Sequence, residues 1–600
     1  MKNDLNVSIV EAFLNRLELG ISENQSLEFL PNWLVRNTGH PTIPKAKMSF
    51  KDHEFQIDIV KSTAHKQSTI KISQAGMTEA SIRKALGLAT LRQKVHLIYT
   101  LPTASFARKI AKTRVDTIIE QSPIMSSMLD KNVDSTEIKR LGDSFVYFQG
   151  TFSEKSAISV PASYVISDEV DFSDQDVLSD YKSRLGHQDE DESFIARFST
   201  PTVDGFSISE DYSASSQGHY AVKCLCCNTW QTPGFLEHVV IPDIDMGVPD
   251  LTREYALEHK DKGVFDNAYV YCPNCKKDLW ESLCDPSRRA WVHAYPQRVK
   301  DHEGFRVTPF DVPRINSVTK TLKEITEYRR LASWYNYKLG LTYSDNTNKF
   351  NTDITRRNIT LTYGEGATGL CMGVDIGKQT WVIVGKPYYD PLTHQVNGAD
   401  ILFYGRIDHT KLGIGETIGS EIIKVQNKYG VISSVIDAAP DFTTAKIVKD
   451  NQQKGATYGA YYTGEATFSK KMTYYEVKDS LHTVNAARTS SLDLVCEINN
   501  RGGFKFVKSP ESDTLLSHLS AVSRVEPENM PTEPRWVKIG NRDDHYVHAL
   551  NYFCLAADIS HNRDPGDVSI SLPLTLSKVN IANVNDRGIN LTNRRPYGQQ

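Results

Sequence analysis

The stretch from residue 162 to residue 171 constrains the fold of this chain more than any other. An apolar run rich in β-branched and aromatic residues ends abruptly at two adjacent acids, Asp168 and Glu169. A buried parallel strand has this pattern when it brings acidic side chains to the carboxyl edge of a sheet, where open α/β folds bind their ligands. We therefore expect a carboxylate site at such an edge. A strand that ends in solvated acids is the alternative.

Further strand-like runs alternate with helical stretches around this one. Alternation of this kind predicts a doubly wound, mainly parallel sheet with helices on both faces. The expected strands lie at residues 68–72, 95–103, 144–149, 162–168 and 193–201, and a helix is expected over 107–120.

The first of these strands leads into a loop with the layout of a phosphate cradle. Gln74, Ala75, Gly76 and Met77 precede Thr78, and a helical segment follows. Backbone N–H groups of such a loop and the helix N-terminus bind anions. Lysine normally precedes the Thr or Ser of a P-loop, and Met77 stands there instead. Lys71 could supply the missing charge, and an ordinary strand–turn–helix is the alternative.

Other residues would complete an ATP site of this kind. Thr78 and Asp168 are candidates for holding Mg²⁺, and Glu169 is the candidate that polarises the attacking water. Thr200 ends the strand that follows the acid pair, where a polar side chain could sense the γ-phosphate. Gln56 follows an aromatic residue ahead of the first strand and could read adenine, although it also fits an ordinary polar helix position.

Two pairs of cysteines indicate a metal site in the middle of the chain. Six of the nine cysteines fall between Cys224 and Cys284, which favours a metal centre over a dispersed disulfide framework. Cys224 and Cys227 form one C-x₂-C pair, and Cys272 and Cys275 form another. Four thiolates make a closed, structural Zn²⁺ site. Cys226 is an alternative ligand, and free buried cysteines are the alternative to a metal.

The C-terminal half contains three groups of acidic residues that lie in or next to expected strands and helices. Asp375 lies in a strand that a glycine turn joins to a return strand, as in the opening hairpin of RNase H-like nucleases. Asp437 ends a buried strand, and Asp543 and Asp544 precede an amphipathic helix. Convergent carboxylates suit hard divalent ions, and two such ions clamp the entering and leaving oxygens of a phosphodiester. Acids that cap strands and helices for structural reasons are the alternative.

The motifs together resemble the large terminase subunit of tailed bacteriophages, in particular its lambda-like branch, whose phosphate loop lacks the usual lysine and carries one upstream. The resemblance rests on residues 101–103, 114–116, 122–123, 167–171 and 199–201.

This resemblance assigns roles to the residues named above. It implies that Lys71, Gly76 and Thr78 form the phosphate loop, Asp168 is the Mg²⁺ acid and Glu169 the catalytic carboxylate. Ser73 stands where some relatives have an arginine, so Arg83 and Arg114 are both candidates for the arginine finger. In the second half the resemblance implies that Asp375, Asp437 and Asp544 bind Mg²⁺ or Mn²⁺, with Asp543 or His545 as helpers.

The length of 600 residues exceeds the ~250–300 residues at which a single core stops growing. We expect an α/β protein: a P-loop ATPase with a zinc-knuckle insertion, followed by an RNase H-like nuclease. The expected segments are an N-terminal segment (1–48), the ATPase core (49–215), the knuckle insertion (216–290), the rest of the motor and a linker (291–364), the nuclease (365–560) and a tail (561–600). A short helix is expected at residues 7–19.

The resemblance also implies partners and a place of action. They are double-stranded DNA, the portal protein of the procapsid, a small terminase subunit and further copies of the chain in a ring, in the host cell cytoplasm and without a membrane. The net charge of −4 implies that any DNA-binding surface is local. Three other functions share parts of the pattern: a cellular helicase–nuclease, a DNA-binding module with an inactive ATPase, and an RNase H-like recombinase.

Overall fold

The computed structural model describes residues 26–562 except 93, 153–161, 186–192, 344–348, 363–366, 414, 440–441, 453–454, 470–472 and 529–532. The helix expected at 7–19 and the tail from residue 563 lie outside the described residues. Contacts divide the chain into two units. The first comprises Met1–Arg357, Asn499–Arg501 and Pro510–Val547, and the second Asn358–Ile498, Gly502–Ser509 and His548–Gln600. The block expected at 365–560 is thus divided, because 510–547 groups with the first unit.

A mainly parallel sheet forms the centre of the first unit, in the order β11-β7-β12-β1-β6-β5-β2-β4-β3, with β8 paired to β7. The pairs from β7 to β4 along this order are parallel, and β3, β8 and β11 add antiparallel edges. The strands are β1 (Lys66–Ile70), β2 (His96–Leu101), β3 (Ile138–Leu141), β4 (Ser144–Gly150), β5 (Tyr164–Asp168), β6 (Phe194–Ser199), β7 (Gly218–Lys223), β8 (Trp230–Gln231), β11 (Arg289–His293) and β12 (His302–Arg306). This confirms the expected α/β class.

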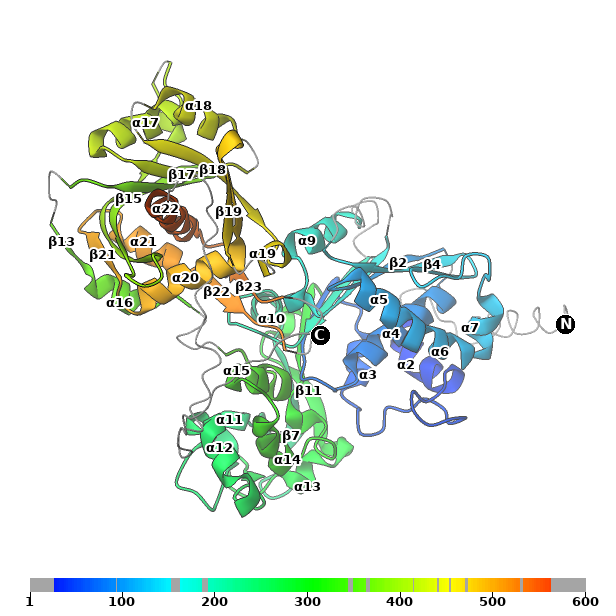
Figure 1. The fold of residues 1–600 in the computed structure, drawn as a ribbon. Coiled ribbons are helices and arrows are strands. Elements are labelled where there is room, and N and C mark those ends of the chain that lie inside the picture. Colours follow the sequence, from blue (N-terminus) through cyan, green and yellow to red (C-terminus); the bar gives the residue numbers. More distant parts are fainter. Residues whose placement is uncertain are drawn as a thin grey trace, which may run out of the picture. The chain divides into compact units, whose positions relative to one another are not determined.

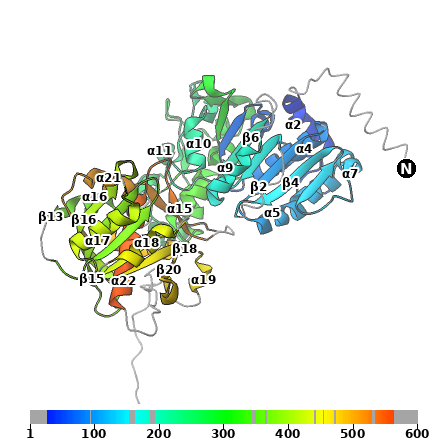
Figure 2. The ribbon, with the colours of Figure 1, turned by 90° about the horizontal axis from the view of Figure 1, so that it is seen from above.

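Helices cover both faces of this sheet because successive side chains of a strand point to opposite sides. On β2, Leu97 and Tyr99 belong to one core with α4, whereas Ile98 packs with α9 on the other side. Figure 1 shows α4 and α5 below the blue and cyan strands, and Figure 2 shows α2 beside α4. The helices are α2 (Ser26–Asn37), α3 (Gln56–Lys61), α4 (Met77–Leu91), α5 (Ala104–Ile110), α6 (Asp116–Glu120), α7 (Pro123–Met128), α9 (Gln175–Ser183) and α10 (Ile208–Ala214).

The cysteine-rich segment is joined to this sheet at both ends, since β7 leads into it and β11 follows it. Its apolar residues, such as Phe235 and Leu279, form one core together with residues that follow β12, among them Trp334. Its elements are α11 (Phe235–His238), β9 (Val239–Val240), α12 (Arg253–His259), β10 (Tyr269–Val270) and α13 (Trp280–Leu283), and α14 (Val318–Lys323) and α15 (Leu331–Trp334) follow β12. The first unit is completed by α16 (Thr352–Arg357), α21 (Ser512–Leu519), β22 (Val522–Val525) and β23 (Arg535–Lys538).

A nine-stranded mixed sheet forms the second unit, in the order β13-β21-β16-β15-β14-β17-β18-β20-β19. In Figure 1 α17 and α18 lie on one side of it and α22 on the other. The strands are β13 (Ile359–Leu361), β14 (Cys371–Ile376), β15 (Thr380–Tyr389), β16 (Val396–Ile407), β17 (Ser433–Asp437), β18 (Ala456–Thr463), β19 (Tyr475–Lys478), β20 (Thr483–Ala487) and β21 (Phe504–Val507). The helices are α17 (Ile418–Tyr429), α18 (Thr443–Asn451), α19 (Ala466–Ser469), α20 (Arg488–Asn500) and α22 (His545–His561).

Helix α22 packs very closely on β14, and a glycine makes this possible. A Cβ at Gly373 would lie 2.1 Å from the carbonyl oxygen of Ala549 and 2.2 Å from the amide nitrogen of Phe553. Any side chain there would push the helix away from the strand that carries Asp375. Among the described helices none is long and apolar enough to cross a membrane.

Candidate functional sites

Three neighbouring strands of the first unit end at the same level and deliver the expected ATP-site residues. Ile70 at the end of β1 is in register with Ser199 on β6, and Asp168 on β5 is in register with Phe198. Lys71, Glu169 and Thr200 therefore follow directly at the carboxyl edge, as the parallel topology requires.

Asp168 is 1% exposed and is held by two hydroxyl groups. Thr78 donates to its Oδ2 at 2.7 Å, and Tyr99 donates to the same oxygen at 3.2 Å. Within the described chain Oδ1 has no hydrogen-bond partner, and neither has the buried hydroxyl of Thr200. Unpaired buried oxygens are costly, so both atoms fit a ligand of the site such as a hydrated Mg²⁺ or a phosphate.

Lys71 and Glu169 form an ion pair at this edge. The Nζ of Lys71 lies 2.5 Å from Oε1 of Glu169, and both side chains are almost buried. Burial alone would lower the pKa of Lys71, but the charges of Glu169 and Asp168 outweigh it and raise the pKa. Lys71 is therefore a permanent cation beside both acids, although it lies outside the loop that normally carries one.

The loop after β1 presents its backbone to the same place. Gly76 adopts φ +73° and is the N-cap of α4, so the helix N-terminus begins at Met77. Gln74 also lies in the left-handed region, at φ +63°. The side chains of Ala75 and Met77 are buried in the core, so the backbone of this loop remains to bind an anion.

Beside the loop lies a cavity of about 530 Å³, lined by Gln56, Gly76, Glu79, Arg83 and Arg114 among others. Gln56 is 5% exposed and donates to the carbonyl oxygen of Ala75 at 2.7 Å. The side chain that was expected to recognise adenine is therefore also hydrogen-bonded to the backbone of the phosphate loop.

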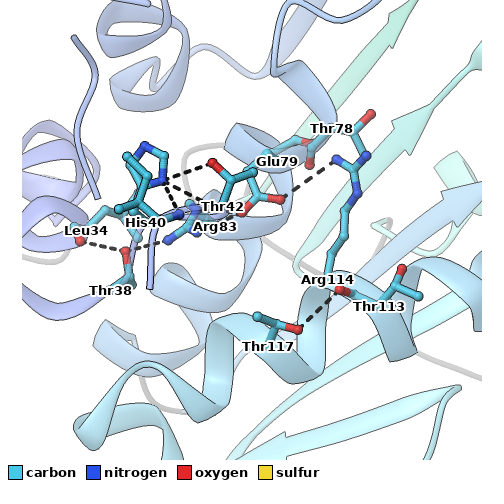
Figure 3. A network of polar contacts seen from close by, with 12 residues as sticks. Leu34, Thr38, His40, Thr42, Thr78, Glu79, Arg83, Thr113, Arg114 and Thr117 are labelled. Carbon is cyan, nitrogen blue, oxygen red and sulfur yellow. Dashed lines mark hydrogen bonds and ion pairs between the residues drawn. The ribbon is translucent and has the colours of Figure 1, made fainter. Parts of the chain in front are cut away.

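The two candidate arginine fingers differ in their surroundings (Figure 3). Arg83 is fully buried, donates to Thr38 Oγ1 at 2.6 Å and is bound to Glu79 at 2.7 Å. Arg114 is 43% exposed and its guanidinium lies 3.8 Å from Glu79. In Figure 3 the Arg114 guanidinium is directed toward Thr78 and Glu79. It lies on a π-helical turn, Ala111–Val115, and such turns occur frequently at functional sites.

In the second unit, Asp375 and Asp437 come from adjacent parallel strands. Val374 is in register with Ile436, so each acid follows the paired position on its strand. Burial, together with the charge of Asp375, raises the pKa of Asp437 to about 6. Tyr552 on α22 donates to Oδ1 of Asp437 at 3.3 Å. Two neighbouring carboxyls at the ends of adjacent strands fit a divalent cation.

Asp543 and Asp544 belong by their contacts to the first unit. Lys538 lies 3.6 Å from Oδ1 of Asp544 and 3.9 Å from Oδ1 of Asp543, and His545 lies 3.9 Å from the same Asp543 oxygen. Asp544 directly precedes α22 and is nearly buried, whereas the side chain of Asp543 is exposed. Their expected role in metal binding stays a prediction.

The four expected cysteines converge. Their sulfurs all lie within 4.8 Å of one another, the only group of three or more such potential metal ligands within the described ranges. Both pairs have the same turn: the amide of Cys224 bonds Thr229 and that of Cys272 bonds Lys277. Asn228 and Lys276, the residues after each pair, are left-handed at φ +57° and +61°. Two matching knuckles of four thiols fit a tetrahedral metal ion, and Cys226 lies outside the group.

Several residues around these sites were not predicted. Tyr99 was placed on an expected strand without a role, and Tyr552 on an expected helix. Both carry hydroxyls at buried positions, which must find partners, and this is the signal that could have identified them.

Comparison with known proteins supports the sequence motifs. Residues 53–285 match the family model described as phage terminase large subunit gpA, ATPase domain, in agreement with the resemblance that the motifs indicated. No curated protein matches the chain.

Among solved structures, the chain is similar to the large terminase of bacteriophage HK97, with 9% identity over 88% of this chain and 98% of that one and a TM-score of 0.47. It is similar to the large terminase ATPase domain of Thermus phage P74-26, with 14% identity over 49% and 93% and a TM-score of 0.28. It is also similar to the large terminase nuclease of the thermophilic phage G20c, with 17% identity over 34% and 94% and a TM-score of 0.20.

Proposed function

We propose that the chain is the large subunit of a viral DNA-packaging terminase. The proposal starts from the match of residues 53–285 to the phage terminase large subunit ATPase family. In this role the chain hydrolyses ATP to move double-stranded DNA into a procapsid. It also cuts concatemeric DNA with a metal-dependent nuclease in its second half.

The observation that carries the ATPase is the pairing of four residues at one sheet edge. Thr78 contacts Asp168 at 2.7 Å, and Lys71 contacts Glu169 at 2.5 Å. In a P-loop enzyme the Mg²⁺ ion bridges and neutralises phosphate oxygens, and here Thr78 and Asp168 would hold it. The backbone from Gln74 to Thr78 would bind phosphate, while Lys71 supplies the positive charge that Met77 cannot.

Glu169 is the group that acts on water in this proposal. Its Oε2 accepts a hydrogen bond from Ser199 at 3.3 Å, while Lys71 holds Oε1, so both oxygens have a fixed direction. A carboxylate held in this way can orient a water molecule and take its proton. Arg114, partly exposed at the cavity, is the cation that we expect to face the phosphates, because Arg83 is already bound to Thr38 and Glu79.

The test is Glu169→Gln in the full chain. It should bind ATP with Mg²⁺ yet hydrolyse it at least ~10²-fold more slowly, because the water loses its base. The wild type should turn over faster when DNA is added. Unchanged hydrolysis by the variant would remove residues 162–171 from the active site.

For the nuclease, the support is that Asp375 on β14 and Asp437 on β17 come from adjacent parallel strands. Strand β14 also belongs to the antiparallel unit β14–β16, and the sheet continues through β17 into the parallel strand β18. Such an arrangement fits an RNase H-like nuclease. Asp375, Asp437 and Asp544 would hold Mg²⁺ or Mn²⁺, with Asp543 and His545 as helpers. A pair of such ions stabilises the entering and leaving oxygens of a phosphodiester.

The cysteine site is proposed as structural Zn²⁺, held by Cys224, Cys227, Cys272 and Cys275. It would have no open position for a substrate, so its role is to fix the segment between β7 and β11. The further partners are those of a packaging motor: DNA, the portal of the procapsid, a small subunit and a ring of copies, in the host cytoplasm.

Three other functions predict different results. A DNA-binding module with an inactive ATPase would show no ATP turnover, with or without DNA. A recombinase would cut DNA without any dependence on ATP in the complete packaging system. A cellular helicase–nuclease would unwind duplex DNA, whereas a packaging motor moves it intact, so a strand-separation assay distinguishes the two.

A further inference from the structure

A two-stranded ribbon from the C-terminal half of the chain belongs to the first unit. Strands β22 and β23 pair antiparallel, with Val522 opposite Lys538 and Val525 opposite Arg535. Val525 and Val537 pack in one apolar cluster with Phe172, Val203, Phe206 and Tyr337. Phe172 lies three residues after Glu169, so this ribbon packs against the segment that directly follows the acid pair.

Arg535 is the polar contact between the ribbon and that segment. Its Nη2 donates to the carbonyl oxygens of Asp171 at 3.1 Å and Ser173 at 2.8 Å. Its Nη1 donates to the carbonyl oxygen of Phe172 at 3.3 Å. One guanidinium thus holds three consecutive carbonyls, a use of its planar fork that a lysine ammonium cannot reproduce.

The local backbone explains why these carbonyls need a donor. Glu169 adopts φ +55°, a left-handed conformation that is costly for a residue with a side chain. The single 3₁₀ turn Val170–Phe172 follows it, and the last carbonyls of a helical turn have no partner within the turn. Arg535 supplies charged donors to these carbonyl oxygens.

The same segment is held from a second side by the side chain of Asp171. Its Oδ2 accepts from the amide of Thr202 at 2.8 Å and from the Thr202 hydroxyl at 2.7 Å. Its Oδ1 accepts from the amide of Ile208 at 3.0 Å. The carboxylate thus ties the acid segment to the loop that follows Thr200, while Arg535 ties its carbonyls to the ribbon.

Tyr337 connects the phosphate loop to the same cluster. Its carbonyl oxygen accepts from the amide of Ser73 at 2.7 Å, and its ring stacks on Phe172 at 6.2 Å. Its hydroxyl accepts from the amide of Glu528, in the segment between β22 and β23, at 3.3 Å. The ribbon therefore contacts the surroundings of both the phosphate loop and the acid pair.

We propose that Arg535 is a positioning residue for ATP hydrolysis, which holds the segment from Glu169 to Ser173 so that the Glu169 carboxylate faces the attacking water. The inference rests on the proposed ATPase function and deepens it. The ATPase site is completed by a ribbon that lies 364 residues further along the chain than the carbonyl of Asp171.

The experiment compares Arg535→Ala with Arg524→Ala in the full chain. Arg524 lies on the other strand of the ribbon, where it is bound to Glu526 at 2.5 Å, so it controls for damage to the ribbon. With Arg535→Ala we expect kcat for ATP to fall about tenfold or more, because a misplaced base loses orientation. KM should change less than about twofold, because Arg535 contacts neither the phosphate loop nor Gln56. Arg535→Lys should recover only part of kcat.

A double variant tests whether Arg535 acts through Glu169. In the Glu169→Gln background, Arg535→Ala should lower kcat no further, because the group that it positions is already lost. A further fall there would overturn the proposal. So would a wild-type kcat in Arg535→Ala, or a fall in kcat and melting temperature equal to that of Arg524→Ala. Full activity of Glu169→Gln by itself would instead overturn the proposed ATPase site.

Discussion

Asp168 with Glu169 and Asp375 with Asp437 are two pairs of neighbouring acids, and they differ in the charges that surround them. Asp168 is buried and Asp437 is partly buried, and burial raises the pKa of each carboxyl to about 6. At Asp168 the neighbouring Lys71 opposes the rise, whereas at Asp437 the neighbouring Asp375 adds to it. The first pair has the cation Lys71 beside it, whereas the proposed nuclease site would take divalent ions from solution. We therefore expect the second pair to depend more strongly on metal.

The largest effect expected is at the second pair. Asp375→Asn or Asp437→Asn should abolish DNA cleavage, because one of the carboxylates that would hold the divalent ions is lost. ATP hydrolysis should stay near that of the wild type, since the acids belong to different units. Cleavage in wild type should require Mg²⁺ or Mn²⁺, and Ca²⁺ should bind without supporting it. Normal cleavage by Asp375→Asn, measured on a linear duplex, would contradict the nuclease assignment.

At the first pair the chain's own cation can be removed. Lys71→Ala should raise KM for ATP and lower turnover by about 10²-fold, because a phosphate contact and the partner of Glu169 are both lost. The matched control is Met77→Leu, which keeps the apolar volume of a buried residue in the loop and should cost less than about 1.5 kcal/mol of stability. If Met77→Leu lost ATP hydrolysis and Lys71→Ala kept it, Lys71 would not be the cation that contacts the phosphates.

The cysteine site should be independent of both pairs. Metal analysis of the purified chain should find about one Zn²⁺, and Cys224→Ser should lose it together with the stability of residues 215–285. Cys226→Ser is the control, because Cys226 lies outside the group of four sulfurs. Cleavage by the second unit should survive in Cys224→Ser. A metal-free wild type with full activity would leave the four cysteines as core residues.

The smallest effect concerns pH. A carboxyl whose pKa is higher in the folded state than in the unfolded state costs stability once the pH exceeds the unfolded value, near 4. Without metal, Asp437→Asn should therefore melt above the wild type at pH 7, by a few °C. The difference should shrink as the pH falls from 6 to 4 and vanish below it. Mn²⁺ should raise the melting temperature of the wild type alone, and an equal rise in both would contradict the comparison.

Much of the motor site was predictable because its parts are local or ordered by topology. Parallel strands end at one edge, so Asp168, Lys71 and Thr200 could be placed together from the order of the strands. The two cysteine pairs could be joined because a single C-x₂-C pair cannot complete a tetrahedral site. The proposed preference for Arg114 over Arg83 draws on the structure, because it compares how firmly each guanidinium is already bound.

The ribbon could not be predicted, and the reason is physical. Its strands are short, and what places them on the first unit is packing of valines against Phe172 and three hydrogen bonds from Arg535 to carbonyl oxygens. Every residue has a backbone carbonyl oxygen. The sequence of residues 171–173 therefore does not indicate that their carbonyl oxygens accept hydrogen bonds from a distant arginine. The expected nuclease block of 365–560 was drawn as continuous for the same reason.

The late position of Arg535 has a consequence for the order of synthesis. At roughly 5–20 residues per second, a ribosome that has made Asp171 needs about 20–70 s more to reach the ribbon. Under the role proposed for Arg535, a nascent chain would be able to bind ATP before it could hydrolyse ATP efficiently. A chain that stops before residue 535 would stay in that state. Efficient ATP hydrolysis would then begin only after most of the second half of the chain has been translated, so an unfinished chain would hydrolyse little ATP.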